Sequence, residues 1–416
     1  MSHLAVIVVV LVGATAACAQ VALDRALDRV HHALGVASAD GRFRADLSGL
    51  LDVEGYYIDQ RPPALIFGGG SGLVNPRLSL FLDAHAGPRL YGFVRARFDR
   101  GFDPRERPDG SARLDEYLGR WTPLADPRLN LQFGKFATVV GNWVARHDSW
   151  TNPFIDAPLP YENVTTVGDA KAPASLPEFL ARRNVPDKKN DWVPMVWGPS
   201  YTSGGAIFGR LGAFDYAAEA KNAPLSTRPH YWDASVRAWE RPSAAARFGW
   251  RPRAAVAVGA SFASGPYLQD DAERTLAPGQ DVGDFRQSVV GADASFAWRH
   301  LELWAEFLAS RFEVPIAGSA PRSVDADTAA YYVEGRYKIT RTLFGALRWN
   351  QQFFGDVPDG RGGESAWDRD AWRVDTALGW RFGRHLQTKL QYAFLRQTGD
   401  LQQGQQLVAA QVTLKF

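Results

Sequence analysis

The sequence contains one cysteine, Cys18, and two methionines among its 416 residues. Cys18 is the middle residue of Ala17-Cys18-Ala19, which has the A-x-A pattern of a signal-peptide cleavage site. Cleavage after Ala19 would leave a mature chain without cysteine, so no disulfide bond could stabilise it in an oxidising compartment. We therefore expect its stability to come from backbone hydrogen bonds and side-chain packing.

The chain also lacks an excess of charge of either sign, because 47 Lys and Arg residues face 45 Asp and Glu residues. This balance gives no indication of a nucleic-acid partner. After the amino-terminal segment there is no apolar run of about 18 residues, the length that a membrane-spanning helix needs. A helical membrane protein is thus excluded, whereas a β-barrel is not, because only every second residue of its strands faces lipid.

The first residues resemble a secretory signal, with an apolar segment Leu4–Val12 before the cleavage pattern. The segment before Leu4 carries no Lys or Arg, which departs from the usual pattern. Cys18 is an alternative as a lipoprotein acceptor, but Thr15 stands where such signals usually carry Leu. We predict a signal peptide over 1–19, a short periplasmic helical segment over 20–40 and an outer-membrane barrel over 41–416.

Residues 21–36 have the spacing of a helix, with Leu23, Leu27, Val30 and Leu34 on one seam. One interpretation is a short helix that plugs or caps the periplasmic mouth of the barrel. The other is a coiled-coil stub that joins protomers. Two heptads are too few to decide between the two interpretations.

From about residue 42 onward the apolar residues recur with a period of two, as in half-buried strands. In Leu407–Phe416, Val408, Val412 and Phe416 share one face, while the other face is mostly polar. A terminal apolar strand would be an aggregation hazard at a free sheet edge, but in a closed barrel it pairs with the first strand. About sixteen such segments start near residues 42, 76, 89, 113, 128, 201, 213, 243, 253, 286, 300, 329, 341, 371, 385 and 407.

The connections between these segments alternate in length, as expected for short periplasmic turns and long outer loops. Gly87-Pro88, Arg251-Pro252 and Gly383-Arg384 are among the predicted short turns. The longest connection, residues 138–200, is rich in proline and aromatic residues and follows the fifth strand. Long connections of this kind are usually functional or disordered, and the aromatic content argues against disorder. We expect this third outer loop to fold inward and form the constriction.

The fold class that follows is all-β, a transmembrane antiparallel β-barrel of about sixteen strands with an inward-folded third loop and a short N-terminal helix. In architecture the chain resembles outer-membrane general porins. The stretch Leu129–Trp143, LNLQFGKFATVVGNW, is similar to the phosphate-selective (polyphosphate/phosphate) porin family. That resemblance implies a trimer with a pore lined by Arg and Lys that passes anions. Residues 138–200, however, are almost neutral, which departs from the family's pattern.

The sequence offers little support for catalysis. His147-Asp148-Ser149 contains the residue types of a hydrolase triad, but adjacent residues of an extended stretch point in opposite directions. No G-x-S-x-G or H-E-x-x-H motif occurs, and the histidines lack metal-ligand spacing. We predict no enzyme activity, no catalytic residue, no cofactor and no metal. A barrel enzyme of the lipase or protease type and a plugged structural barrel remain the alternatives.

Charged residues on the polar faces of the strands are the candidate pore lining. A mainly basic wall, with Asp46, Asp83, Glu334 and Asp375 interspersed, would face an acidic wall across the lumen. We predict thirteen pore-lining residues: Arg44, Arg77, Arg95, Arg97, Asp215, Glu219, Glu302, Glu306, Arg336, Lys338, Arg348, Arg373 and Arg381. Phe416 is the predicted assembly signal.

These features together predict a porin in the outer membrane of a Gram-negative bacterium, a water-filled channel for passive diffusion of small hydrophilic solutes. Anions such as phosphate are candidate solutes. The expected partners are outer-membrane lipids and lipopolysaccharide, the barrel assembly machinery, and two further copies in a homotrimer.

Overall fold

The computed structural model describes residues 16–59, 71–100, 111–185, 188, 190–237, 239–318, 322–399 and 404–416. The predicted apolar signal segment Leu4–Val12 lies outside the described residues. In the described part of the chain, no helix is both long enough and apolar enough to span a bilayer.

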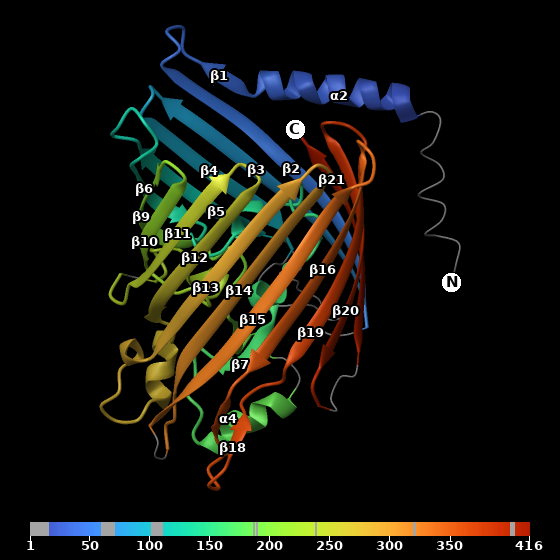
Figure 1. The fold of residues 1–416 in the computed structure, drawn as a ribbon. Coiled ribbons are helices and arrows are strands. Elements are labelled where there is room, and N and C mark those ends of the chain that lie inside the picture. Colours follow the sequence, from blue (N-terminus) through green and yellow to red (C-terminus); the bar gives the residue numbers. More distant parts are fainter. Residues whose placement is uncertain are drawn as a thin grey trace.

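Sixteen antiparallel strands form one closed barrel (Figure 1), which confirms the predicted fold class and strand number. Each strand pairs with the next, and β21 pairs with β2 to close the ring. The barrel strands are β2 (Phe43–Ile58), β3 (Gly72–Ala86), β4 (Leu90–Asp99), β5 (Ser111–Trp121), β6 (Asn130–Phe136), β9 (Thr202–Leu211), β10 (Phe214–Lys221), β11 (Ser243–Arg253), β12 (Val256–Pro266), β13 (Arg286–Trp298), β14 (Leu301–Pro315), β15 (Ser323–Lys338), β16 (Leu343–Phe354), β19 (Ala371–Arg381), β20 (Leu386–Gln397) and β21 (Gln405–Lys415).

The two faces of the barrel wall differ as the period-two pattern predicts. On β2, Val53 points outward and is exposed, whereas its neighbours Asp52 and Glu54 point inward and are buried. Val53 pairs in register with the exposed Val412 of β21. Since a lipid-facing band must be apolar, this arrangement places the charged side chains in the lumen.

The seam between β2 and β21 is closed by the last residue. Phe416 and Gly49 exchange two backbone hydrogen bonds, of 3.0 and 2.9 Å. The Phe416 ring occupies the space beside Gly49, where the Cβ atom of any other residue would lie 2.4 Å from the ring. A side chain at position 49 would therefore displace the ring of Phe416 from its place at the seam.

Short turns gather at one end of the barrel and long loops at the other (Figure 1), as predicted. The turn expected at Arg251-Pro252 lies slightly later, between β11 and β12. The cause is an irregularity in register between Trp250 and Arg253, which keeps both predicted residues inside β11. By the usual orientation of such barrels, the end with short turns faces the periplasm.

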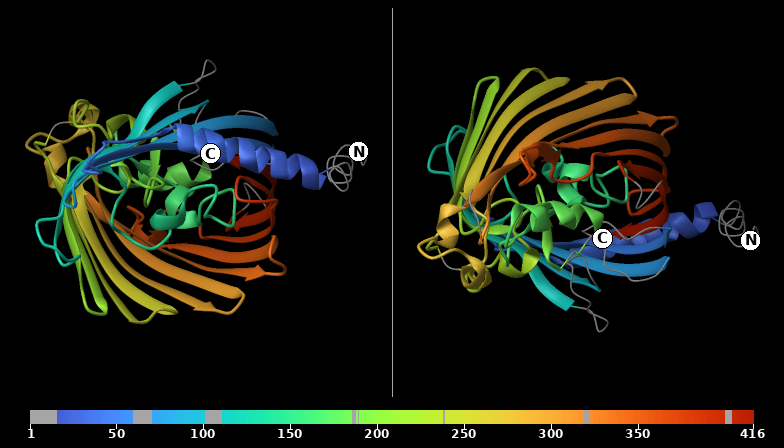
Figure 2. Two further views of the ribbon diagram at one scale, coloured as in Figure 1. Left: turned by 90° about the horizontal axis from the view of Figure 1, so that it is seen from above. Right: turned by 90° about the horizontal axis from the view of Figure 1, so that it is seen from below.

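An amino-terminal helix, α2 (Ala16–Ala33), lies along the rim at the end with short turns (Figures 1 and 2). Its Asp28 contacts Arg384 at 2.7 Å and His385 at 3.1 Å, next to the turn between β19 and β20. The helix is followed by β1 (Gly35–Ala37), which pairs with the start of β2. Helix α2 is thus attached to the rim and does not enter the lumen as a plug.

The remaining elements belong to the third loop and the other outer loops. They are the 3-10 helices η1 (Val144–Arg146), η2 (Arg182–Asn184), η3 (Pro229–Tyr231), η4 (Asp270–Thr275) and η5 (Val282–Asp284), the helices α3 (Leu159–Glu162) and α4 (Leu176–Ala181), and the short strands β7 (Val164–Gly168), β8 (Trp192–Pro194), β17 (Asp356–Pro358) and β18 (Glu364–Ala366). A large apolar cluster lies at the end of the barrel with the long loops, where Phe179, Trp197 and other loop residues pack against Phe312 and Trp367.

Candidate functional site

The third loop, residues 137–201 between β6 and β9, occupies much of the lumen (Figure 2). Phe154, Tyr161, Trp197 and Tyr201 are fully buried, although a loop of a solvated pore would expose such residues. Burial of large aromatic side chains is strongly favourable, so they fix the loop inside the barrel. The predicted inward fold of this loop is confirmed.

One side of the loop is fastened to β16, β19 and β20 by buried charges. Arg348 Nη2 contacts Asp156 Oδ1 at 2.6 Å, and Arg373 pairs with Glu162. Arg348 is 0% exposed, so its ion pairs with Asp156 and with Asp375 of β19 are sheltered from water. The loop's carboxylates therefore neutralise arginines of the barrel wall.

Lys389 of β20 makes a second attachment through backbone oxygens. Its Nζ atom donates hydrogen bonds to the carbonyl oxygens of Ser149 at 2.8 Å, Asn152 at 3.0 Å and Phe154 at 3.0 Å. An ammonium group has three donors, and all three are used here. Lys389 thus sets the path of the loop between residues 149 and 154.

The loop is also fastened to β14. Glu306 accepts hydrogen bonds from the Asn142 backbone N–H at 2.9 Å and from the Tyr161 hydroxyl. Gly141 has a φ of +76°, and a Cβ atom there would lie 2.3 Å from the Glu306 carboxylate. Glycine therefore permits both the left-handed backbone and the close approach.

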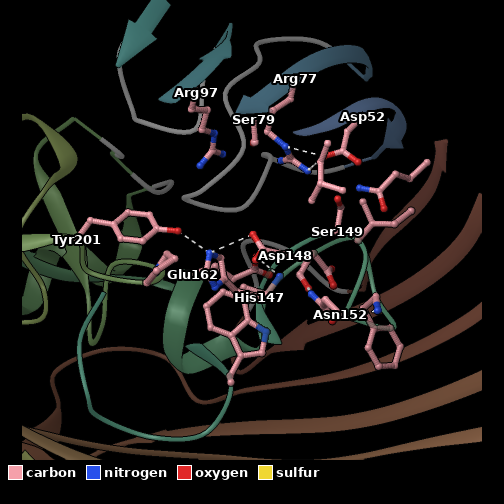
Figure 3. Close-up of a pocket in the computed structure, with 18 of the residues that line it drawn as sticks. Asp52, Arg77, Ser79, Arg97, His147, Asp148, Ser149, Asn152, Glu162 and Tyr201 are labelled. Atoms are coloured by element: carbon pink, nitrogen blue, oxygen red, sulfur yellow. Dashed lines mark hydrogen bonds and ion pairs between the residues drawn. The ribbon is translucent and has the colours of Figure 1, made fainter. Parts of the chain in front are cut away.

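The other side of the loop, toward β2–β5, does not pack tightly against the wall. A cavity of ≈ 80 Å³ lies there, between the loop stretch 143–157 and the strands (Figure 3). Asp52, Arg77, Ser79 and Arg97 line it from the strands. His147, Asp148, Ser149 and Asn152 line it from the loop. At this cavity, charged side chains of the loop face charged side chains of the barrel wall across open space.

Arg95 of β4 connects the two sides of this cavity. Its Nη2 atom contacts Asp148 Oδ1 at 2.7 Å, and its Nη1 atom lies 2.9 Å from His147 Nε2. Because a guanidinium can only donate, Nε2 must be the unprotonated nitrogen of the ring. The Nδ1–H group then donates to the Val144 carbonyl oxygen at 2.5 Å. Burial lowers the pKa of His147 to about 4, so the ring is neutral at ordinary pH.

The arginines of the cavity wall are accompanied by carboxylates. Arg77 contacts Asp52 at 2.9 Å and Glu54 at 2.6 Å, and Arg97 contacts Asp99 at 2.6 Å. Asp115 of β5 is 3.1 Å from Arg97 and also 2.7 Å from Arg113. The basic wall predicted from the sequence is therefore largely neutralised by its own strands.

Asp115 was missed by the sequence analysis because β5 has a register irregularity opposite Arg95 and Ala96 of β4. The irregularity brings Asp115 and Glu116, adjacent in sequence, both to the inner side, where Glu116 lies 3.8 Å from Arg95. A strict alternation cannot predict two neighbouring inward residues. The adjacent carboxylates of Asp115 and Glu116, close to Arg113, were the available signal.

All thirteen predicted pore-lining residues lie on the inner face of the barrel, but they fall into three settings. Arg77, Arg95 and Arg97 line the cavity. Those toward the periplasmic mouth are Arg44, Asp215, Glu302, Arg336, Lys338 and Arg381. Those covered by the third loop are Glu219, Glu306, Arg348 and Arg373, and these four hold the loop in place instead of lining open space.

Two observations on the described residues concern catalysis and metal binding. Both ring nitrogens of His147 are engaged, one with Val144 and the other with Arg95 and Tyr201. In the described residues, no group of three or more His, Cys, Asp or Glu side chains is arranged to hold a metal ion.

No protein-family model matches this sequence, and no curated protein matches it. Solved structures do match its fold. The outer membrane channel DcaP of Acinetobacter baumannii is 14% identical with a TM-score of 0.58, over 92% of this chain and 99% of that one. An anion-selective porin from Comamonas acidovorans is 10% identical with a TM-score of 0.55, over 90% of this chain and 100% of that one. OmpF of Salmonella typhi, in complex with daunomycin, is 10% identical with a TM-score of 0.54, over 92% and 100%.

These similarities show the fold of outer-membrane porins, and the outer face of the barrel is apolar, as that fold requires. The predicted class of outer-membrane β-barrel is thus confirmed. The similarities do not extend to the phosphate-selective family, which no comparison supports.

Proposed function

We propose that this barrel is a channel for passive diffusion of small hydrophilic solutes, with its narrowest point between the third loop and strands β2–β5. The observation that carries the proposal is the contrast between the two sides of the loop. Against β14–β20 the loop packs through buried ion pairs and aromatic side chains, whereas against β2–β5 it leaves a cavity lined by charged groups from both sides. If the loop served only to plug the barrel, we would expect it to pack against the wall on both sides.

The solutes that suit this constriction are small and polar, with weak selection by charge. Each cavity arginine has a carboxylate partner, and the loop opposite contributes Asp148. Lys135, in the stretch similar to phosphate-selective porins, donates to the Leu114 carbonyl oxygen at 2.7 Å and does not line the cavity. Anions such as phosphate remain candidate solutes, but we expect them to pass without a strong preference.

Purified protein in planar lipid bilayers tests this proposal directly. We expect discrete conductance steps, and a reversal potential near zero in a gradient of KCl. A folded, heat-modifiable barrel without conductance would support the plugged structural barrel instead. Hydrolysis of a lipid or peptide substrate that depends on Ser149 or His147 would support the barrel enzyme.

We also propose a homotrimer in the outer membrane, surrounded by phospholipid and lipopolysaccharide and inserted by the barrel assembly machinery with Phe416 as the signal. Residues 1–19 would be the cleaved signal peptide, and the rest of α2 would remain on the periplasmic rim. Cross-linking of the protein in isolated outer membranes should yield a trimer band. A band at the mass of the monomer only would contradict the assembly.

A further inference from the structure

A second concave region lies at the periplasmic rim, away from the lumen cavity. It is an open notch of ≈ 480 Å³ between the β9–β10 turn and the β11–β12 turn. Arg210, Arg251 and Arg253 line it, and the other lining residues are small or apolar, such as Gly212 and Ala213. No carboxylate lines the notch among the described residues.

The charges of these arginines are poorly compensated within the protein. Arg210 Nε donates to the Gly212 carbonyl oxygen at 3.0 Å, and neither Arg251 nor Arg253 forms an ion pair within the described part of the chain. The neighbouring Arg128 pairs with Asp126 at 2.7 Å, so an arginine at this rim can have an acidic partner. Three like charges around one notch repel each other and favour an anion.

The notch has a defined shape because its two turns are joined. The Arg251 backbone N–H donates to the Ala213 carbonyl oxygen at 2.7 Å, which links the β11–β12 strand end to the β9–β10 turn. This hydrogen bond fixes the backbone of the two turns that carry the arginines relative to each other. Planar guanidinium forks match the geometry of phosphate oxygens.

An apolar surface lies next to the notch on the outer face of the barrel. Phe214 pairs in register with Trp250, and its ring stacks on Phe248 with ring centroids 5.5 Å apart. All three side chains are about half exposed. Arg253 pairs with Val256, on the same lipid-facing side. Aromatic side chains beside arginines at a membrane boundary match the two parts of a lipid, its acyl chain and its headgroup.

We propose that this notch binds the phosphate group of a phospholipid from the periplasmic leaflet, with an acyl chain along Phe248 and Trp250. The aromatic residues favour a lipid over free phosphate, which has no apolar part. They also favour a lipid over the carboxylates of peptidoglycan for the same reason. The bound lipid would fix the height of the barrel in the bilayer, a role independent of solute diffusion.

Native mass spectrometry of the delipidated barrel, titrated with phosphatidylglycerol, tests the proposal. The variant Arg251→Gln/Arg253→Gln removes two notch charges. The control Arg89→Gln/Arg341→Gln removes the same charge from two other periplasmic turns, where neither arginine has an ion pair among the described residues. We expect wild type and control to retain one lipid and the notch variant to bind it at least about tenfold more weakly. Equal retention by all three proteins would overturn the proposal.

Two further arms identify the source of the phosphate. Phe248→Ala/Trp250→Ala should weaken phosphatidylglycerol binding, and inorganic phosphate in excess should not displace the lipid from wild type. Phosphate that displaces the lipid fully, together with an unchanged affinity of the aromatic variant, would identify a free-anion site and overturn the lipid assignment. Displacement by a soluble peptidoglycan fragment would overturn it as well.

Discussion

The two sides of the third loop show how the same residue types serve opposite purposes. On the side toward β16, Arg348 is 0% exposed and holds Asp156, whose side chain is 1% exposed, in a buried contact. On the side toward β4, Arg95 holds Asp148 in a similar pair, but the Asp148 side chain is 34% exposed to the cavity. The ion pairs have comparable geometry, so burial decides which of them anchors the loop and which borders a passage. Charge pattern alone therefore does not locate a pore.

We expect the largest effect on conductance from breaking the buried contacts between the loop and strands β16 and β19. Arg348→Ala would remove the partner that the buried carboxylates of Asp156, Asp375 and Glu334 share, and would leave them only their pairs with Arg373 and Arg146. Breaking a buried pair in this way destabilises by about 3–5 kcal/mol. We expect the loop to leave its place, with higher single-channel conductance and more current noise.

The control for that variant is Arg336→Ala, which removes a partly exposed arginine from its pair with Glu302 near the periplasmic mouth. Its effect on conductance noise should be much smaller. If Arg348→Ala folds and shows the same conductance and current noise as wild type, the contacts with β16 and β19 do not anchor the loop.

The second largest effect should come from acid, which weakens the contact between His147 and Arg95 on the cavity side of the loop. The pKa of His147 is about 4 in the folded loop against 6.5 for a free ring, so the undocked loop binds protons more readily. Docking is thus fully stable above pH 6.5 and weakens as the pH falls toward 4, by up to about 3 kcal/mol. Conductance should be constant from pH 7 to 8 and change below pH 6.

The variant His147→Gln tests the source of this acid response, because glutamine can accept from Arg95 and does not titrate. We expect its current–pH curve to be flat over the same interval. An acid response equal to that of wild type would show that another group, such as a carboxylate of the loop, causes it.

Deleting Phe416 leaves both sides of the loop intact and tests the barrel seam alone. Burial of one Phe contributes only about 1.5–3 kcal/mol, so a packing role predicts a modest loss of heat resistance. A role as assembly signal predicts much less folded barrel in the outer membrane. Semi-quantitative gels of heated and unheated membranes separate the two, and a normal yield of folded barrel would refute the signal.

The smallest effect should come from Asp148→Asn, which removes one charge from the cavity side. Arg95 keeps Glu116 at 3.8 Å, so we expect the loop to stay docked and conductance to stay the same. The reversal potential in a salt gradient should move slightly toward anion preference, because one carboxylate leaves the constriction. An unchanged reversal potential would mean that ions do not pass this cavity.

Much of the barrel could be predicted from the sequence because alternation is a local property. All sixteen predicted strand starts lie close to the observed ones. The largest difference is in β15, which begins at Ser323 and not near 329, since Asp325 and Asp327 occupy outward positions. Outward carboxylates are not expected where a strand faces lipid, but beyond the membrane they are tolerated. There Arg311 pairs with both.

The interior of the third loop could not be predicted in the same way. Its contacts join residues far apart, such as Arg348 with Asp156 and Arg373 with Glu162, 192 and 211 positions away. No spacing rule connects such pairs. The sequence did indicate that the loop's charges nearly balance, but it could not show that the loop's carboxylates form ion pairs with arginines of the barrel wall.

The closure of β2 on β21 has a consequence for the order in which the molecule can form. Glu54 and Gln411 are 357 residues apart and Asp52 and Thr413 are 361 apart, so the ring joins the most distant parts of the chain. Contacts of such separation form slowly. Lys389, which holds the loop at residues 149–154, also lies near the end of the chain. We therefore expect docking of the third loop to remain incomplete until the last strands pair, and its completion to coincide with closure of the barrel wall.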